Sequence, residues 1–94
     1  MFDYIEGEVA GRALARLVLD VGGVGYDLSV PLSSRFPATG RTRAWTHLAV
    51  REDAHTLYGF DDRGTRDLFR LLLLVRGVGP TLALSVLSGL PRDP

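Results

Sequence analysis

The residues with the clearest chemical potential form a glycine-rich turn, Gly77-Val78-Gly79-Pro80, inside the apolar stretch of residues 68–87. Glycine permits a reversal too tight for other side chains, and proline is tolerated at the first position of a helix. The free amides and the dipole of a helix that begins there favour an anionic oxygen such as that of a phosphate. Ala83, one turn later, is small enough to let two helices pack closely. The pattern predicts an anion-binding turn, although a glycine turn between packed helices without any ligand would look the same.

A second candidate is the carboxylate pair Glu52 and Asp53, in the connection of residues 52–55 between two expected strands. Charged side chains at a hairpin tip are usually only solvated, and taken alone the pair favours that interpretation. The other acidic pair, Asp61 and Asp62, precedes a helical pattern and is explained by helix capping. Neither pair therefore requires the two-carboxylate chemistry of a glycosidase or nuclease chemistry.

Other catalytic and metal chemistries lack the residues that they require. The chain has no cysteine, which excludes disulfides and thiolate metal sites. His47 and His55 have no evident third ligand, and zinc sites take three or four. The serines have no histidine or lysine at motif spacing, and the phosphate-binding loop of ATPases is missing. We therefore expect no cofactor, no metal and no catalytic residue.

Aromatic side chains raise one further possibility, a platform on which single-stranded bases stack. Because they occupy alternating strand positions, we interpret them instead as part of a barrel core. They are Phe2, Tyr4, Tyr26, Trp45, Tyr58 and Phe60.

The first sixty residues alternate between apolar and polar types, which is typical of strands. Strands are expected around residues 5–9, 17–21, 26–30, 43–51 and 56–60. Gly22-Gly23-Val24-Gly25 connects the second strand to the third and supplies positive φ, and the strand after it excludes a dinucleotide-binding loop. Residues 31–40 are predicted to form a loop or a short helical turn. Five short antiparallel strands predict a small closed barrel, with the OB-fold as the leading candidate.

From residue 62 the pattern becomes helical. The first helix is expected to run to about Arg76, and a second over residues 80–88, ending at Gly89 with Pro91 beyond it as a stop signal. The first helix is apolar over well over half its circumference, with Leu68, Leu72 and Val75 on one stripe. Leu71 and Leu74 lie on the other flank and are expected to remain uncovered. The predicted fold class is an all-β barrel (residues 1–61) followed by a helix-hairpin-helix segment (residues 62–94).

The charge balance bears on possible partners. Eleven arginines, with no lysine, balance eleven acidic residues in a chain of 94. Because nucleic-acid-binding proteins are usually basic, DNA binding would require these charges to be segregated on the surface. No apolar run approaches the length of a membrane span and no signal peptide is apparent, so no membrane partner is expected.

Together these segments resemble a known family. The turn between the helices resembles the helix-hairpin-helix motif, which grips the DNA backbone without reading bases. Over residues 5–90, the order of motifs is similar to that of the RuvA family, the Holliday-junction-binding subunits of a bacterial branch-migration complex. The motifs are Val21-Gly22-Gly23-Val24-Gly25-Tyr26, Val50-Arg51-Glu52-Asp53-Ala54, Leu57-Tyr58-Gly59-Phe60, Leu68-Phe69 and Gly77-Val78-Gly79-Pro80.

The resemblance implies a specific architecture and specific partners. Members of the family carry an OB barrel, two helix-hairpin-helix motifs and a C-terminal domain that engages the RuvB motor. The present chain would correspond to the barrel and the first hairpin motif only, an N-terminal fragment without the motor-binding domain. The expected partners are four-way junction DNA, three further copies in a homotetramer, a RuvB-type hexameric motor that hydrolyses ATP, and a junction resolvase. The expected location is the bacterial cytoplasm.

The resemblance also assigns roles to residues. Gly77, Val78, Gly79 and Thr81 match the phosphate-binding hairpin, although the family commonly has lysine or arginine at the position of Thr81, whose hydroxyl carries no charge. Glu52 and Asp53 match the acidic pin, which would repel converging phosphates at the centre of a junction. The alternative function is an oligomerising OB-fold module that binds other proteins and has no role on DNA.

Overall fold

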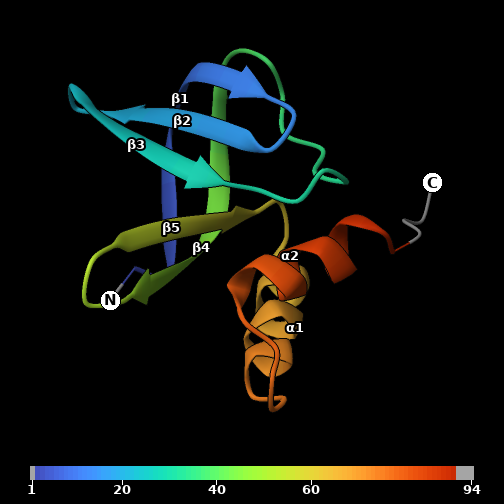
Figure 1. Cartoon of the computed structure of the whole chain (residues 1–94). Helices are drawn as coiled ribbons and strands as arrows, with labels where there is room; N and C mark the ends of the chain where they lie inside the picture. Colours follow the sequence, from blue (N-terminus) through green and yellow to red (C-terminus); the bar gives the residue numbers. More distant parts are fainter. Residues whose placement is uncertain (1, 91–94) are drawn as a thin grey trace.

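The alternating segments of the chain form five strands, and two helices follow them in this computed structural model, which describes residues 2–90 (Figure 1). Pro91, the expected stop signal, lies outside the described residues. The elements are β1 (Tyr4–Ala13), β2 (Arg16–Val21), β3 (Val24–Ser29), β4 (Arg41–Val50), β5 (His55–Phe60), α1 (Arg63–Leu73) and α2 (Pro80–Ser88).

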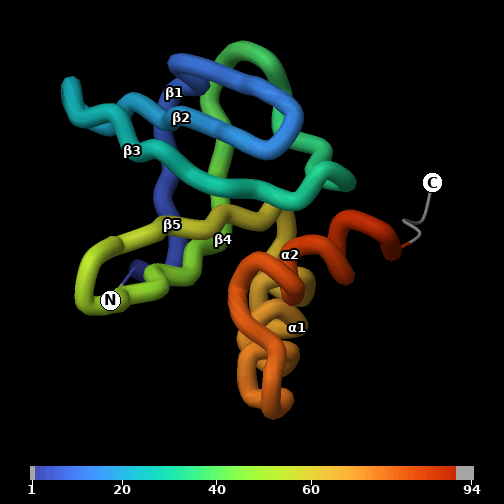
Figure 2. The backbone as a smooth tube through the Cα atoms, viewed as in Figure 1, coloured from blue at the N-terminus to red at the C-terminus, as the bar shows by residue number. Residues whose placement is uncertain are grey.

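The five strands close into a barrel in the order β1-β2-β3-β5-β4. β1 has a register shift between Val9 and Gly11 in its pairing with β2. Its first half pairs with β4 and its second half pairs with β2, both antiparallel. A short parallel contact, in which Leu28 and Ser29 of β3 face β5, completes the closure. The predicted OB-fold barrel is confirmed. Figure 2 shows the path of the backbone through the five strands and into the two helices.

The connection between β2 and β3 is shorter than expected. Val21 pairs directly with Val24, so the turn consists of Gly22 and Gly23 alone and Val24 belongs to β3. Both glycines have positive φ, 59° and 89°, as the sequence predicted. Two-residue hairpins favour such turns because their twist matches that of the strands. The predicted four-residue connection was therefore too long.

The predicted loop at residues 31–40 contains a turn in which the Ser34 amide donates to the Pro31 carbonyl, 3.0 Å away.

The interior of the barrel is filled mainly by branched aliphatic side chains. Its buried residues are Ile5, Leu17, Leu19, Leu28, Val30, Phe36 and Ala44. None of the six aromatic residues assigned to the barrel core belongs to this buried set; of the six, only Tyr26 packs against it, from a partly buried position. Phe2 and Tyr4 are 40% and 43% exposed, and Tyr4 packs edge-on against Trp45 on the outside of the sheet, 5.3 Å between ring centroids. The interpretation was wrong for Phe2 and Tyr4, whose side chains are largely exposed. Tyr58 and Phe60 are buried, but they belong to a second cluster, and the barrel interior instead contains the ring of Phe36.

A second buried cluster joins the helices to the barrel. Its members are Tyr58, Phe60, Phe69, Ala83 and Leu87. The ring of Phe69, from α1, is fully buried and lies 4.9 Å from the ring of Phe60 and 5.1 Å from that of Tyr58, centroid to centroid. Ala83 is fully buried, as its expected role between the helices requires. The division into two domains at residue 61 stays a prediction, since this shared cluster spans both parts.

Arg66 forms a polar anchor beside this cluster. Its side chain is almost fully buried, and its Nη1 donates to the Asp3 carbonyl (2.7 Å) and to Asp3 Oδ1 (2.6 Å). Its Nη2 also donates to Asp67 Oδ1 at 3.0 Å. The hydrogen bond from Arg66 lowers the pKa of Asp3. Asp3, just before β1, is thereby tied to α1.

Helix α1 begins as predicted and ends earlier than predicted. Asp62 is the N-cap, and its Oδ1 accepts from the amides of Gly64 (2.7 Å) and Thr65 (3.2 Å). The helix stops at Leu73 rather than near Arg76. The amides of Leu74 and Val75 donate three residues back, to Leu71 and Leu72, which tightens the last turn before the hairpin.

The buried side of α1 also differs from the expected stripe. Phe69, Leu72 and Leu73 face the barrel and α2, whereas Leu68 and Val75 are 39% and 53% exposed. Leu72 of the expected stripe is confirmed, whereas Leu68 and Val75 were wrong, because the all-leucine run at residues 71–74 gives no helical phase and the bulky Phe69 sets the orientation. The expected exposure of Leu71 (61%) and Leu74 (82%) is confirmed.

His47 should make the folded state sensitive to acid. Its ring packs against Phe69, and its Nδ1 accepts a hydrogen bond from Arg70 Nε at 3.3 Å, which requires that nitrogen to be unprotonated. Burial, with the nearby charges of Arg70 and Arg66, lowers the pKa of His47. Its contribution to stability is therefore complete above the unfolded-state pKa of about 6.5 and is lost as the pH falls through that value toward the lower native pKa.

We expect the free energy of unfolding in urea to decrease between pH 7.5 and pH 5.5, and this decrease to be smaller in His47→Gln. His55→Gln, at an exposed position of β5, is the matched control and should keep the wild-type pH dependence. Equal pH dependence in both variants would contradict the role of His47.

Candidate nucleic-acid interface

The hairpin between the helices has the geometry that the glycine-rich sequence predicts. Gly77 has a φ of 85°, a backbone conformation that residues other than glycine rarely adopt. Gly79 is the N-cap of α2, and Pro80 occupies the first position of the helix. The first hydrogen bond of the helix runs from the Ala83 amide to the Gly79 carbonyl, 3.0 Å. The amide of Thr81 precedes this bond and has no partner within the helix.

The four predicted phosphate-binding residues differ in what they offer. The amide of Val78 donates to the Val75 carbonyl at 3.0 Å, and its side chain packs against the second buried cluster. Gly77 supplies the reversal of the chain, and Thr81 places an exposed side chain on the first turn of α2. Gly77 and Val78 therefore shape the turn, whereas Gly79 and Thr81 stand at the start of α2.

The acidic pair lies at the tip of the β4–β5 hairpin. Arg51 and Ala54 exchange two backbone hydrogen bonds, of 2.8 and 3.4 Å, and so close a turn of residues 51–54. Glu52 and Asp53 occupy the two positions between them, and both are exposed. The connection therefore begins and ends one residue earlier than the sequence suggested, with both carboxylates projecting from it.

A groove brings the two candidate sites together. It lies between the β4–β5 hairpin and the first turn of α2 and has a volume of about 290 Å³. Asp53 lines it from one side and Thr81 from the other, although they come from separate motifs. Its full lining is Ala49, Arg51, Asp53, Ala54, Thr56, Tyr58, Pro80 and Thr81. Glu52, the neighbouring residue of the same tip, is not part of this lining.

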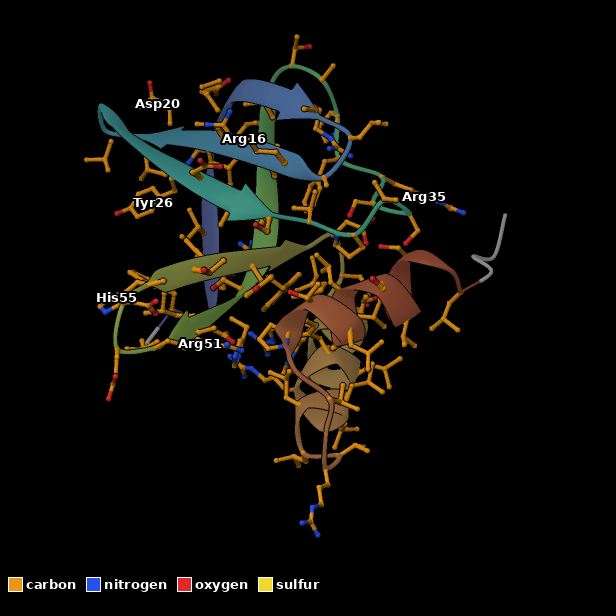
Figure 3. All side chains as sticks on the ribbon, in the orientation of Figure 1. Arg16, Asp20, Tyr26, Arg35, Arg51 and His55 are labelled. Carbon is orange, nitrogen blue, oxygen red and sulfur yellow. The ribbon has the colours of Figure 1, made fainter. Side chains whose placement is uncertain are left out.

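Arg51 also lines this groove, although no role was predicted for its side chain from the sequence. Its Nη2 lies 3.7 Å from the position that a Cβ on Gly79 would take, so the guanidinium rests against the hairpin of the helices. In Figure 3, Arg51 extends from the end of β4 toward the helices, whereas His55 lies on the far side of the same hairpin. The one feature of the sequence that could have pointed to Arg51 is its position in the Val50–Ala54 motif, directly before the acidic pair.

The histidines do not form a metal pair. His47 stands opposite Tyr58, and His55 stands opposite Val50, so the two rings are three positions apart on the paired strands. Within residues 2–90, no three His, Cys, Asp or Glu residues are grouped as metal ligands would be. Neither described helix is long and apolar enough to cross a membrane.

Comparison with known proteins gives the family. Residues 1–59, which include the barrel strands up to Gly59 and the acidic hairpin, match the model of the RuvA N terminal domain. The chain belongs to the RuvA N-terminal domain family. The resemblance drawn from the sequence motifs is thereby confirmed.

Relatives from several bacteria extend the RuvA match to nearly all of the chain. The Holliday junction branch migration complex subunit RuvA of Alkalilimnicola ehrlichii is 50% identical over 99% of this chain and 46% of its own length. The subunits of the same name from Pseudomonas putida W619 and Pseudomonas savastanoi pv. phaseolicola are 48% and 50% identical, over 99% of this chain and 47% and 48% of their own lengths. The chain spans about half the length of the curated relatives it matches.

Proposed function

We propose that this chain binds four-way (Holliday) junctions in DNA as a non-catalytic subunit of a branch-migration complex in recombination and repair. The observation that carries the proposal is the groove that joins the acidic hairpin to the start of α2, with Asp53 and Thr81 in its lining. Membership of the RuvA N-terminal domain family, with relatives named as Holliday junction branch migration subunits, supports it.

DNA is held through its phosphates in this proposal. The hairpin of Gly77, Val78, Gly79 and Thr81 presents the start of α2 to a phosphate oxygen, where free amides and the helix dipole stabilise negative charge. Contacts of this kind fix the position of a strand and carry no base specificity. Shape must then distinguish a junction from a duplex.

Glu52 and Asp53 supply that discrimination as the acidic pin. Both carboxylates are exposed at the hairpin tip, next to the groove in which a phosphate would lie. Like charges at close range repel, so the tip disfavours a stacked, closed crossover and keeps the strands of a junction apart.

The proposed partners follow from the family. They are four-way junction DNA, a homotetramer of this chain, a RuvB-type hexameric motor that supplies ATP-driven movement, and a junction resolvase. The proposed location is the bacterial cytoplasm, and the proposed role requires no cofactor.

The direct test is a titration of a labelled four-way junction and of a linear duplex of the same length and composition, followed by fluorescence anisotropy. We expect the junction to bind more tightly, and both affinities to decrease as salt increases. Equal affinity for the two DNAs, or no binding to either, would overturn the proposal. Self-association without DNA binding would favour the alternative, an oligomerising OB-fold interaction module, which the exposed side chains of Leu71 and Leu74 support.

Neutralising the pin tests the repulsion. In Glu52→Gln with Asp53→Asn, we expect binding to both DNAs to tighten by about tenfold and the preference for the junction to decrease, because two charges that repel phosphates are removed. Glu8→Gln with Asp20→Asn makes an equal change of charge on β1 and β2 and should leave the preference unchanged. Weaker binding by the pin variant would contradict the proposed repulsion.

A further inference from the structure

We infer that Arg51 contacts the phosphate held at the start of α2, so that the β4–β5 hairpin contributes a positive charge to a grip otherwise made by the helices. This inference rests on the proposed function and adds to it a residue from the barrel. In this arrangement the β4–β5 hairpin and the start of α2, which line the groove from opposite sides, bind the same phosphate.

The position of Arg51 is fixed by its backbone. The residue follows β4 directly, and its paired hydrogen bonds with Ala54 hold the base of the turn. From there the guanidinium reaches Gly79, with Nη2 3.7 Å from the position of an added Cβ. Gly79 is the N-cap of α2, so the cation stands beside the amides to which the proposal assigns the phosphate.

The guanidinium is available to a ligand. Within residues 2–90, the Arg51 side chain forms no hydrogen bond or ion pair, and the neighbouring carboxylates of Glu52 and Asp53 are not within ion-pair distance of it. In the same part of the chain, five other arginines form ion pairs with carboxylates, for example Arg16 with Asp27 at 2.7 Å. Arg51 thus keeps its donors free, and they lie on the side of the hairpin that faces α2.

The groove requires a cation at this position to hold an anion well. Among the described residues that line it, Arg51 has the only positive charge and Asp53 the only negative charge. Thr81 offers a hydroxyl, which forms hydrogen bonds without adding charge. A guanidinium matches the geometry of phosphate oxygens and forms stronger hydrogen bonds than neutral donors do.

Attraction and repulsion then come from adjacent residues of one turn. Arg51 draws a phosphate toward α2, while Glu52 and Asp53 exclude it from the tip. A strand is therefore held on the helix side of the hairpin, at a fixed distance from the pin. Arg51 would in this way set where a bound strand lies relative to the carboxylates.

The test compares three variants of the 94-residue chain, Arg51→Gln, Arg51→Lys and Arg16→Gln, in junction titrations at several salt concentrations. Arg51→Gln should weaken binding at low salt by about tenfold and reduce the slope of log affinity against log salt by about one. Arg51→Lys should keep the wild-type slope because it keeps the charge. Arg16→Gln, on β2 at the far side of the barrel (Figure 3), should change neither quantity by a comparable amount.

Two results would overturn the inference while leaving the proposed function intact. In the first, the wild type binds junctions and Arg51→Gln matches it in affinity and in salt slope. In the second, Arg51→Gln loses affinity with an unchanged slope and Arg51→Lys fails to restore it, which indicates a structural role. A wild-type chain that binds no junction at any salt concentration would instead refute the proposed function, and the role of Arg51 with it.

Discussion

Replacing Phe69 by alanine should release α1 and α2 from the barrel, at a cost of about 3–5 kcal/mol in the free energy that holds them there. The Phe69 ring is fully buried between β5 and the helices, against Tyr58 and Phe60. Its removal leaves a cavity at the centre of the cluster that also contains Ala83 and Leu87. For a domain of this size the loss is a large fraction of the total stability.

The barrel should survive this change. Its buried cluster, built around Leu17, Leu19 and Leu28, is separate from the cluster that contains Phe69. We therefore expect hydrogen exchange to accelerate in α1 and α2 while the strands remain protected. Leu14→Ala, at an 82% exposed position in the turn between β1 and β2, is the matched control and should stay within about 0.5 kcal/mol of the wild type.

The Phe69 variant also separates packing from DNA binding. Because the groove is lined from both sides, detached helices would no longer hold Thr81 opposite Asp53, and junction binding should weaken although both motifs remain in the sequence. One cooperative transition that removes strand and helix protection together would contradict the division into two clusters.

The strands of the barrel were predictable because alternation reports a local property, a sheet with one buried face. Leu17 and Leu19 of β2 are both buried, and Asp20 is exposed, as the alternation indicates. The same rule does not say which of two apolar faces lies inside. Tyr4 and Trp45 therefore looked like core residues, although they pack against each other on the outer face of the sheet.

The candidate site was predictable in its parts and not in its assembly. The hairpin glycines and the carboxylates Glu52 and Asp53 stand out as local motifs. The groove between them depends on contacts far apart in the sequence, such as the packing of Phe69 on β5 and the bond from Arg66 to Asp3. Arg51 acquires its proposed role only because the fold brings Gly79 beside it.

The exposed leucines beyond the groove lead to a second large effect. Leu71 and Leu74 are 61% and 82% exposed, and Leu68 and Val75 extend the apolar surface along α1 and the turn after it. Contiguous apolar surface of this kind on a small protein is normally an interaction site. We propose a second copy of the chain as the occupant, in the homotetramer that the family implies, and expect the chain to self-associate.

Leu71→Glu with Leu74→Glu should abolish that association, because each carboxylate would have to be buried without a partner in the contact. Sedimentation equilibrium should give the wild type a mass several times that of the 10.3 kDa chain, most simply four times, and the double variant the mass of a monomer. Leu14→Glu is the matched control, since Leu14 is equally exposed (82%) but lies at the turn between β1 and β2. A monomeric wild type, or a Leu14→Glu variant that dissociates as fully as the double variant, would show that this face is not where copies of the chain meet. Weak junction binding by a wild-type oligomer would remain consistent with the proposal, because each subunit presents a single hairpin and each phosphate contact adds to the affinity.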